Sequence, residues 1–480
     1  MVIQFLSYVV LLLPFVVAAA LGVLLPLLGA VMYRRFGVGL AVIMATAVID
    51  TLMPSLPALQ FGINVYLPDL VFGGVAVLAL LRWLLGRSDP SNGRPSQVAG
   101  APPVTRLRAG ALAVFALVFA INLAQGLIEY KGAAGVAARP TFYALATCGY
   151  AIGFVMNEQR LAALFKAYAW AALAMVLIVI WRGVAVAFDI RELLPVGGSF
   201  QPAGHSIWRV VASAESLLVA QVALSFWFFG RLLPSWSSQS FAALLMVVVT
   251  VALQHRSVWL AAMAGVIVSL WHPGAARRRF SLWMLPALAA GVLLAATLVA
   301  NPETGAGQGP QRGDVASDIA GSARDALDMR GTAADRLSSW RQLLKRWADS
   351  GPRGLALGAP LGATMERYTS DDLSARKVNF QPHNFYVEVL VSHGLIGLIA
   401  YLAMYATALW GLFRARRDPR LGVAAHWLLM LLIVQMTYFI TYGIHELQTL
   451  ALGAALSLAA AVPKAVGRSP GARQPALGET

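Results

Sequence analysis

The sequence has few charged residues and almost no cysteine. Only 12% of its 480 residues are charged, whereas about 25% is usual for a soluble domain. Such a chain cannot cover a globular surface with polar groups, which excludes a soluble cytoplasmic enzyme, a fibrous protein and a disordered chain. The single cysteine, Cys148, excludes an intramolecular disulfide and a cysteine-built zinc or iron–sulfur site within one chain.

Apolar residues are abundant instead, at 59% of the chain. They fall in blocks long enough to cross a bilayer. We therefore expect an all-α polytopic membrane protein with about 12 to 14 transmembrane helices. The blocks lie roughly at 2–33, 37–53, 68–85, 109–128, 140–156, 161–188, 209–230, 239–253, 257–271, 280–300, 384–412, 421–441 and 447–463.

The net charge of +15 lies mainly in alternate short loops between the apolar blocks. This distribution indicates topology rather than nucleic-acid binding, and it predicts an N-terminus outside and a C-terminus inside. We expect transmembrane helices over 1–300, with a Pro/Gly/Ser-rich cytoplasmic linker at 86–108. An outer loop domain follows at 301–382, then transmembrane helices at 383–464 and a cytoplasmic tail at 465–480.

The outer loop contains one strongly amphipathic segment, Asp335–Ala348. Basic residues lie between its apolar positions, and Gly351–Pro352 is expected to end the helix. The apolar face suits either the membrane interface or packing against the transmembrane bundle. A weaker helical pattern covers Ser317–Met329. The apolar positions of the stronger segment are Leu337, Trp340, Leu344 and Trp347.

The most informative motif follows the loop at Pro382-His383-Asn384. Proline suits the first turn of a helix, so His383 is expected at the outer start of a span. The free N–H groups and positive dipole end of that helix would attract an anion and lower the pKa of His383. His393 lies almost three turns further on, so it is expected on nearly the same side but much deeper.

The order of these features resembles the O-antigen ligase and O-antigen polymerase superfamily. The resemblance is carried by a loop with Arg336 and Trp340, by Gly354–Gly358, by His383-Asn384, and by Gly394–Gly397. It implies a GT-C-like membrane glycosyltransferase with one large, partly helical periplasmic loop. It also implies a multi-pass protein of the bacterial inner membrane whose active site faces the periplasm.

The resemblance implies transfer of a glycan from an undecaprenyl-diphosphate carrier without a metal or other cofactor. The acceptor is a lipid A-core sugar in a ligase, or another glycan repeat unit in an O-antigen or exopolysaccharide polymerase. Membrane lipids are the other expected partners, and no nucleic acid is expected. The sequence favours the ligase slightly and leaves the polymerase open.

The resemblance also assigns residues. His383 maps onto the family histidine, and Arg256, within Gln254–Ser257, maps onto an arginine at an outer span edge. Arginine holds phosphate oxygens with two parallel hydrogen bonds and keeps its charge, so Arg256 is expected to bind the diphosphate. Arg209 is the second expected diphosphate contact, and Arg191 is the alternative.

Other residues are expected to support the acceptor or the base. They are Asn384, His445, Glu446, Trp340 and Arg336. Simpler explanations exist for the two principal residues: an interfacial arginine whose charged end reaches water, and a histidine that only caps a helix. A transporter or lipid flippase is the alternative of a different class, although it would not require an outer domain that ends in His-Asn at a span.

Overall fold

The computed structural model shows a bundle of helices. It describes residues 25–53, 59–60, 64–85, 103–188, 190, 210–232, 239–253, 255–271, 332–363, 366–368, 377–379 and 382–461. The first helices are α2 (Phe36–Leu52), α3 (Leu67–Leu85), α4 (Pro103–Tyr130), α5 (Gly132–Ile152), α6 (Glu158–Ala187), α7 (Ser213–Phe229), α8 (Gln239–Ala252) and α9 (Arg256–Leu270). The later ones are α13 (Thr332–Ala348), α14 (Gly351–Leu357), α15 (Phe385–Ala415), α16 (Gly422–Tyr438) and α17 (Glu446–Ala461).

The fold is that of an all-α polytopic membrane protein, as the composition predicts. Among the described residues, four helical stretches are long and apolar enough to cross a bilayer: Leu67–Leu85, Ala109–Tyr130, Glu158–Ala185 and Phe385–Ala415. Six further apolar helices are shorter. The expected spans at 2–33 and 280–300 lie largely or wholly outside the described residues, so the number of 12 to 14 spans stays a prediction.

Two small antiparallel ribbons interrupt the helical architecture. Strand β1 (Leu59–Gln60) pairs with β2 (Asn64–Val65) between α2 and α3. Strand β3 (Glu366–Tyr368) pairs with β4 (Lys377–Asn379) in the large loop. The sequence analysis did not predict them, because runs of two or three residues are too short to show a strand period.

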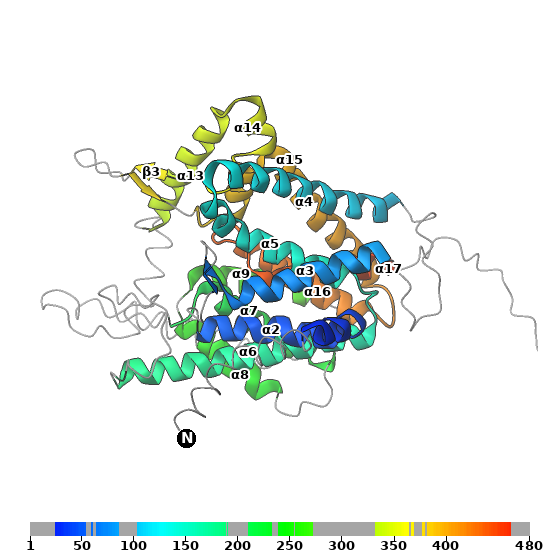
Figure 1. Cartoon of the computed structure of the whole chain (residues 1–480). Coiled ribbons are helices and arrows are strands. Elements are labelled where there is room, and N and C mark those ends of the chain that lie inside the picture. The colour runs from blue at the N-terminus through cyan, green and yellow to red at the C-terminus, as the bar shows by residue number, and fades with distance from the viewer. Residues whose placement is uncertain are drawn as a thin grey trace, which may run out of the picture.

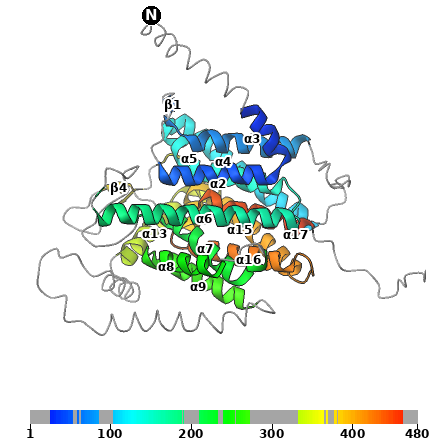
Figure 2. The same ribbon diagram turned by 90° about the horizontal axis from the view of Figure 1, so that it is seen from below.

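The main bundle is built from helices that lie side by side, as both ribbon views show for α2, α3, α5 and α6 (Figures 1 and 2). Helix α17 packs closely on α5, where a Cβ on Gly453 would lie only 2.4 Å from the carbonyl oxygen of Cys148. The hydroxyls of Thr147 and Thr449 join the same two helices at 2.6 Å. Small residues therefore set the spacing at the centre of the bundle.

Helix α15 is not one straight span. Gly394 has φ +64° and ψ −171°, which breaks the helix. The ring centroids of Phe385 and Tyr401 lie 5.1 Å apart, whereas a straight helix would separate these residues by about 24 Å along its axis. The first part of α15 therefore folds back towards the second. His393 is the last residue before the break, so its expected depth relative to His383 stays a prediction.

The end of α14 fills the break in α15. A Cβ on Gly358 would lie 2.4 Å from the backbone carbon of Ser392, and a Cβ on Gly394 would lie 2.3 Å from the backbone of Ala356. The side-chain amide of Asn122, on α4, donates to the carbonyl oxygens of Leu357 (2.5 Å) and Ser392 (2.8 Å). The backbones of α14 and α15 thus meet at this point, and the side chain of Asn122 joins α4 to both.

Helix α13 begins three residues before the expected segment and packs on the bundle. Leu343 is buried against Val387 and Val391 of α15, and two tryptophans of α13 pack beside them. Leu344, which the sequence analysis placed on the apolar face, is exposed instead. The residue that packs against α15 is therefore Leu343, one position before the leucine that the assumed spacing placed on the apolar face.

The loop boundaries in the structure differ in detail from the expected ones. Helix α4 begins at Pro103, inside the expected linker at 86–108. Helix α14 begins at the Gly351–Pro352 stop, with proline in its first turn. The weakly helical segment at 317–329 and the tail after 464 lie outside the described residues.

We predict that Gly394→Ala destabilises the protein strongly. Alanine at φ +64° is strained, and its Cβ would overlap the backbone of α14, so we expect a loss of about 3 kcal/mol or more. Thermal unfolding of the purified protein in detergent measures the change. Gly135→Ala is the matched control, because a Cβ there meets nothing within 4 Å. Equal melting temperatures for the two variants would contradict the account.

Candidate functional site

His383 lies just before α15, at the end of the bundle where α16 ends and α17 begins. Its backbone has φ +44°, and Asn384 rather than Pro382 is the N-cap of α15. Pro382 therefore precedes the helix, and the expectation that it occupies the first turn is wrong. The side-chain oxygen of Asn384 accepts a hydrogen bond from the backbone N–H of Val387 at 3.1 Å.

The start of α15 is fixed to the α16–α17 loop, residues 439–445. The backbone N–H of Phe385 donates to the carbonyl oxygens of Phe439 (2.9 Å) and Tyr442 (3.1 Å). The ring of Tyr442 meets the ring of His383 at 5.8 Å between centroids, in an edge arrangement. The ring of Tyr442 also stacks parallel to that of Tyr438, with 5.2 Å between centroids.

Two residues of α13 complete the group of side chains around His383 and Tyr442, which we call the His383 corner. The guanidinium of Arg336 lies 5.2 Å from the ring centroid of Tyr442 and donates to the carbonyl oxygen of Thr441 at 3.4 Å. The indole N–H of Trp340 donates to the carbonyl oxygen of Pro382 at 2.5 Å. The structure thus brings Arg336, Trp340, His383 and Asn384 together, from a loop helix and a bundle helix that are about 40 residues apart.

The electrostatics of the corner favour a neutral imidazole. Burial, and then the positive charge of Arg336, lower the pKa of His383 below its ordinary value of 6.5. The direction agrees with the sequence-based expectation, but the cause differs, because His383 precedes the helix and a neighbouring arginine takes part. A neutral imidazole at pH 7 is able to accept a proton.

Arg256 is the first residue of α9, and its neighbour His255 is buried. The Nε2 atom of His255 lies within hydrogen-bond distance, 3.2 Å, of the carbonyl oxygen of Val211. Two residues after Val211, the hydroxyl of Ser213 lies 2.6 Å from the hydroxyl of Tyr438. Since Tyr438 stacks on Tyr442, a continuous chain of contacts joins the start of α9 to His383.

The segment that follows Arg209 is held at the same end of the bundle. The buried guanidinium of Arg182 donates to the carbonyl oxygens of Val210 (2.8 Å) and Thr51 (2.5 Å). Arg209 and the alternative Arg191 lie outside the described residues. Val210, next to Arg209 in sequence, thus belongs to the same segment as Val211, which contacts His255.

His445 and Glu446 interact with each other at the start of α17. The Nε2 atom of His445 lies 3.4 Å from a carboxylate oxygen of Glu446. The Nδ1 atom of His445 accepts from the backbone N–H of Leu447 at 3.3 Å. Because both ring nitrogens of His445 are engaged at this helix end, the pair is better suited to support than to proton transfer.

The sequence analysis missed two residues at this corner. Tyr442 contacts both His383 and Arg336, and its spacing of four residues from Tyr438 is the signal that was available. Glu388 lies in the first turn of α15, and its carboxylate oxygen would be 3.7 Å from a Cβ on Gly443. A carboxylate inside an otherwise apolar run is unusual enough to indicate function.

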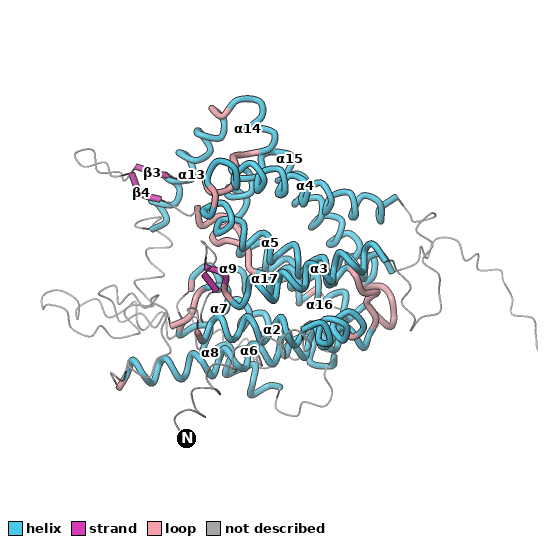
Figure 3. The backbone as a smooth tube through the Cα atoms, in the orientation of Figure 1, coloured by secondary structure: helices cyan, strands magenta, loops and turns pink. Residues whose placement is uncertain are grey.

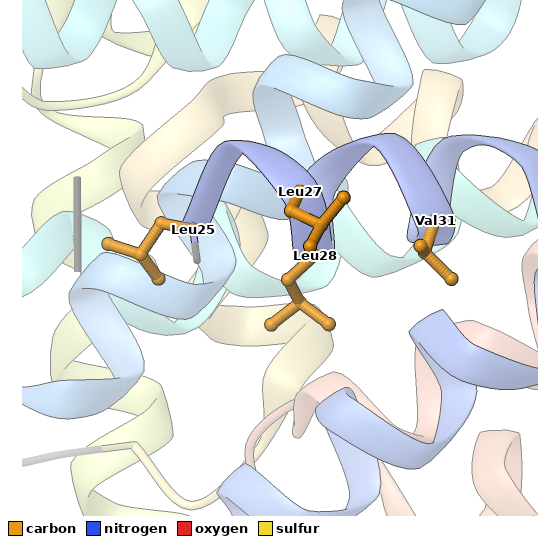
Figure 4. Close-up of a pocket in the computed structure, with 4 residues that line it drawn as sticks. All are labelled: Leu25, Leu27, Leu28 and Val31. Atoms are coloured by element: carbon orange, nitrogen blue, oxygen red, sulfur yellow. The ribbon is translucent and has the colours of Figure 1, made fainter. Parts of the chain in front are cut away.

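His393 and the apolar hollow near the N-terminal end lie apart from this corner. The ring of His393 is buried parallel to the rings of Phe115 and Phe119, with centroids 5.2 Å and 6.1 Å away, which indicates a packing role. The hollow is lined by Leu25, Leu27, Leu28 and Val31 (Figure 4). These aliphatic side chains offer no group that binds phosphate or moves a proton.

Comparison with known families identifies the central segment. Residues 241–402 match the family model described as O-antigen ligase. Over these residues the chain is similar to the O-antigen ligase family. No curated protein matches the chain. The matched segment contains Arg256, Arg336, Trp340, His383 and Asn384. The predicted resemblance to the superfamily is confirmed.

We predict that Trp340→Phe, in the segment that matches the family model, lowers stability by about 1 kcal/mol. The change keeps an aromatic ring but leaves the carbonyl of Pro382 without the indole donor. Trp347→Phe is the matched control, because the buried indole N–H of Trp347 has no hydrogen-bond partner among the described residues. Thermal unfolding of both variants measures the difference. A loss of stability in the control that equals the loss in Trp340→Phe would contradict the role of this hydrogen bond.

Proposed function

We propose that the protein transfers a glycan from an undecaprenyl-diphosphate carrier to an acceptor hydroxyl on the periplasmic face of the bacterial inner membrane. The acceptor is the lipid A-core, so the activity is that of an O-antigen ligase. The family match supports an O-antigen ligase or polymerase type of function. The observation that carries the proposal is the convergence of His383, Arg336 and the start of α9 at one end of a membrane bundle.

The donor chemistry fits the basic residues at this end. A diphosphate leaves readily once its negative charge is neutralised, and arginine supplies a permanent charge with paired hydrogen bonds. In the proposal Arg256 and Arg209 hold the diphosphate. Arg336 adds a third positive charge beside His383, from the loop helix α13. This arrangement provides the charge neutralisation that the reaction needs, without a metal ion or another cofactor.

His383 is the proposed base. Transfer requires that the acceptor hydroxyl loses a proton as its oxygen attacks the anomeric carbon, while the diphosphate leaves with the electrons of the broken bond. The lowered pKa keeps the imidazole of His383 neutral at pH 7, so that it is able to accept this proton. Tyr442, Asn384 and Trp340 position the base, and His445 with Glu446 supports the loop that holds Tyr442.

A polymerase that joins repeat units is the second candidate within the family. It would use the same donor chemistry, with the same arginines and base, and would differ in the acceptor. The matched family segment contains Arg256, Arg336 and His383 but begins after Arg209. The ligase and the polymerase therefore differ in their product, and gel analysis of the surface polysaccharide separates the two activities.

We predict that His383→Ala and Arg256→Ala each reduce glycan transfer by about 100-fold or more. The variants are expressed in the host, and its surface polysaccharide is separated on a gel with protein amounts checked by blot. Long chains that stay unattached would indicate a ligase, and single repeat units would indicate a polymerase.

Two controls accompany this test. Arg417→Ala removes an exposed arginine at the opposite end of the bundle and should leave the polysaccharide unchanged. His383→Gln retains hydrogen bonding but not an equivalent base, and should be as inactive as His383→Ala. Unchanged polysaccharide in both His383→Ala and Arg256→Ala would rule out the proposed site and make a transporter the next candidate to test.

We predict that Arg336→Gln moves the acid limb of the pH–rate profile to higher pH. Activity requires neutral His383, so the rate falls as the pH drops through the pKa of this residue. Burial and Arg336 both lower that pKa, and removing the positive charge leaves burial alone to lower it. The measurement is the transfer rate against pH for both proteins. A limb that stays in place, or moves to lower pH, would show that Arg336 does not act on His383.

A further inference from the structure

The outer surface of α13 and α14 carries a concentration of positive charge. We define the basic edge as Arg341, Lys345, Arg346 and Arg353, all of which are exposed. Between residues 336 and 363 the only acidic residue is Asp349. Arg341 and Lys345 are four residues apart on one helix, where like charges repel and destabilise the helix slightly. A surface that retains this repulsion is suited to an anionic partner.

Arg341 and Lys345 of the basic edge lie on the exposed side of α13. The opposite face of α13 is buried, with Leu343 against Val387 and Val391 and with Trp340 and Trp347 beside them. Figure 1 shows α14 at the margin of the molecule, beyond α15 and α4. Arg341 and Lys345 are therefore exposed on the side of α13 away from α15, and Arg353 reaches Gln125 of α4.

The depth of the basic edge relative to the membrane follows from α4. The guanidinium of Arg353 bonds to the side-chain oxygen of Gln125, and the N–H of Leu361 donates to the carbonyl of Asn122 at 3.1 Å. Both partners lie in the last turns of the apolar span that ends at Tyr130. The headgroup layer is roughly 5 to 8 Å thick on each side of the hydrocarbon core, which corresponds to these last turns.

The neighbouring surface of α4 is suited to lipid. Leu127 and Ile128 are exposed, and Ile128 retains 81% of its accessible surface. Exposed aliphatic side chains beside exposed arginine and lysine are typical of the boundary between acyl chains and headgroups. The charge, direction and depth of the basic edge are thus all those of a surface at the boundary between acyl chains and lipid headgroups.

We propose that the basic edge binds the phosphate groups of anionic lipid headgroups in the leaflet on the His383 side. Arginine and lysine bind phosphate through charge-assisted hydrogen bonds. Anionic lipid attracts basic segments close to the membrane surface. Binding holds α13 at the membrane, and α13 carries Arg336 and Trp340 to the His383 corner. The inference rests on the membrane fold and not on the chemistry of transfer.

The test places a fluorescent label on the full-length chain next to the basic edge. Ala348→Cys is exposed and lies three residues from Lys345, whereas the native Cys148 is buried. A bimane label at position 348 is read in phosphatidylcholine vesicles that contain a nitroxide-labelled lipid. The nitroxide is attached near the top of the acyl chain of either phosphatidylglycerol or phosphatidylcholine, at equal mole fraction.

We predict at least twofold stronger quenching by labelled phosphatidylglycerol than by labelled phosphatidylcholine. The excess should disappear when Arg341, Lys345 and Arg346 are all replaced by glutamine, and should fall by part in Lys345→Gln alone. The control pair Arg417→Gln and Arg420→Gln lies at the other end of the bundle and should keep the full excess. Melting temperatures confirm that each variant is folded.

Three results would overturn the proposal. They are equal quenching by both lipids, an excess that survives in the triple variant, and an excess that inorganic phosphate abolishes at constant ionic strength, which would identify a site for free phosphate instead. The result is independent of transfer: a chain that shows the lipid preference but has no glycan transfer activity would support the basic edge and contradict the proposed function.

Discussion

The contact between two glycine backbones, Gly358 at the end of α14 and Gly394 within α15, constrains the rest of this structure. Neither position has room for a Cβ. Asn122 bonds to carbonyl oxygens on both sides of the contact. Because helix ends need partners for their free backbone groups, this arrangement makes a broken helix tolerable next to the membrane. It also ties the outer loop, the first part of α15 and α4 into one unit.

The folded-back start of α15 determines where the proposed chemistry takes place. It brings Phe385 against Phe439 and Tyr442, so that His383 lies at the end of the bundle and not at the outer tip of a long helix. Helix α13 packs against the same part of α15 and carries Arg336 to the same corner. The proposed transfer thus depends on a loop helix and a bundle helix that are positioned together, with the basic edge of α13 directed to the lipid.

The sequence was sufficient for the fold class, for helix α13 and for the family, because apolar blocks, amphipathic spacing and ordered motifs are local signals. It was not sufficient for the break at Gly394, since a glycine within an apolar run looks the same whether or not another backbone packs against it. The same limit explains why Leu344 was expected on the buried face of α13 in place of Leu343, and why Tyr442 was missed. These features depend on contacts between segments far apart in the chain.

The central claim is that Arg256 binds the diphosphate of the donor and His383 acts in the chemical step. The most direct test is equilibrium binding of undecaprenyl diphosphate to the purified protein and to Arg256→Ala and His383→Ala. The account predicts that Arg256→Ala loses about 10-fold or more in affinity, as expected for a charge-assisted contact, while His383→Ala binds as the unchanged protein does. Equal affinity of all three proteins, or a loss only in His383→Ala, would contradict the account.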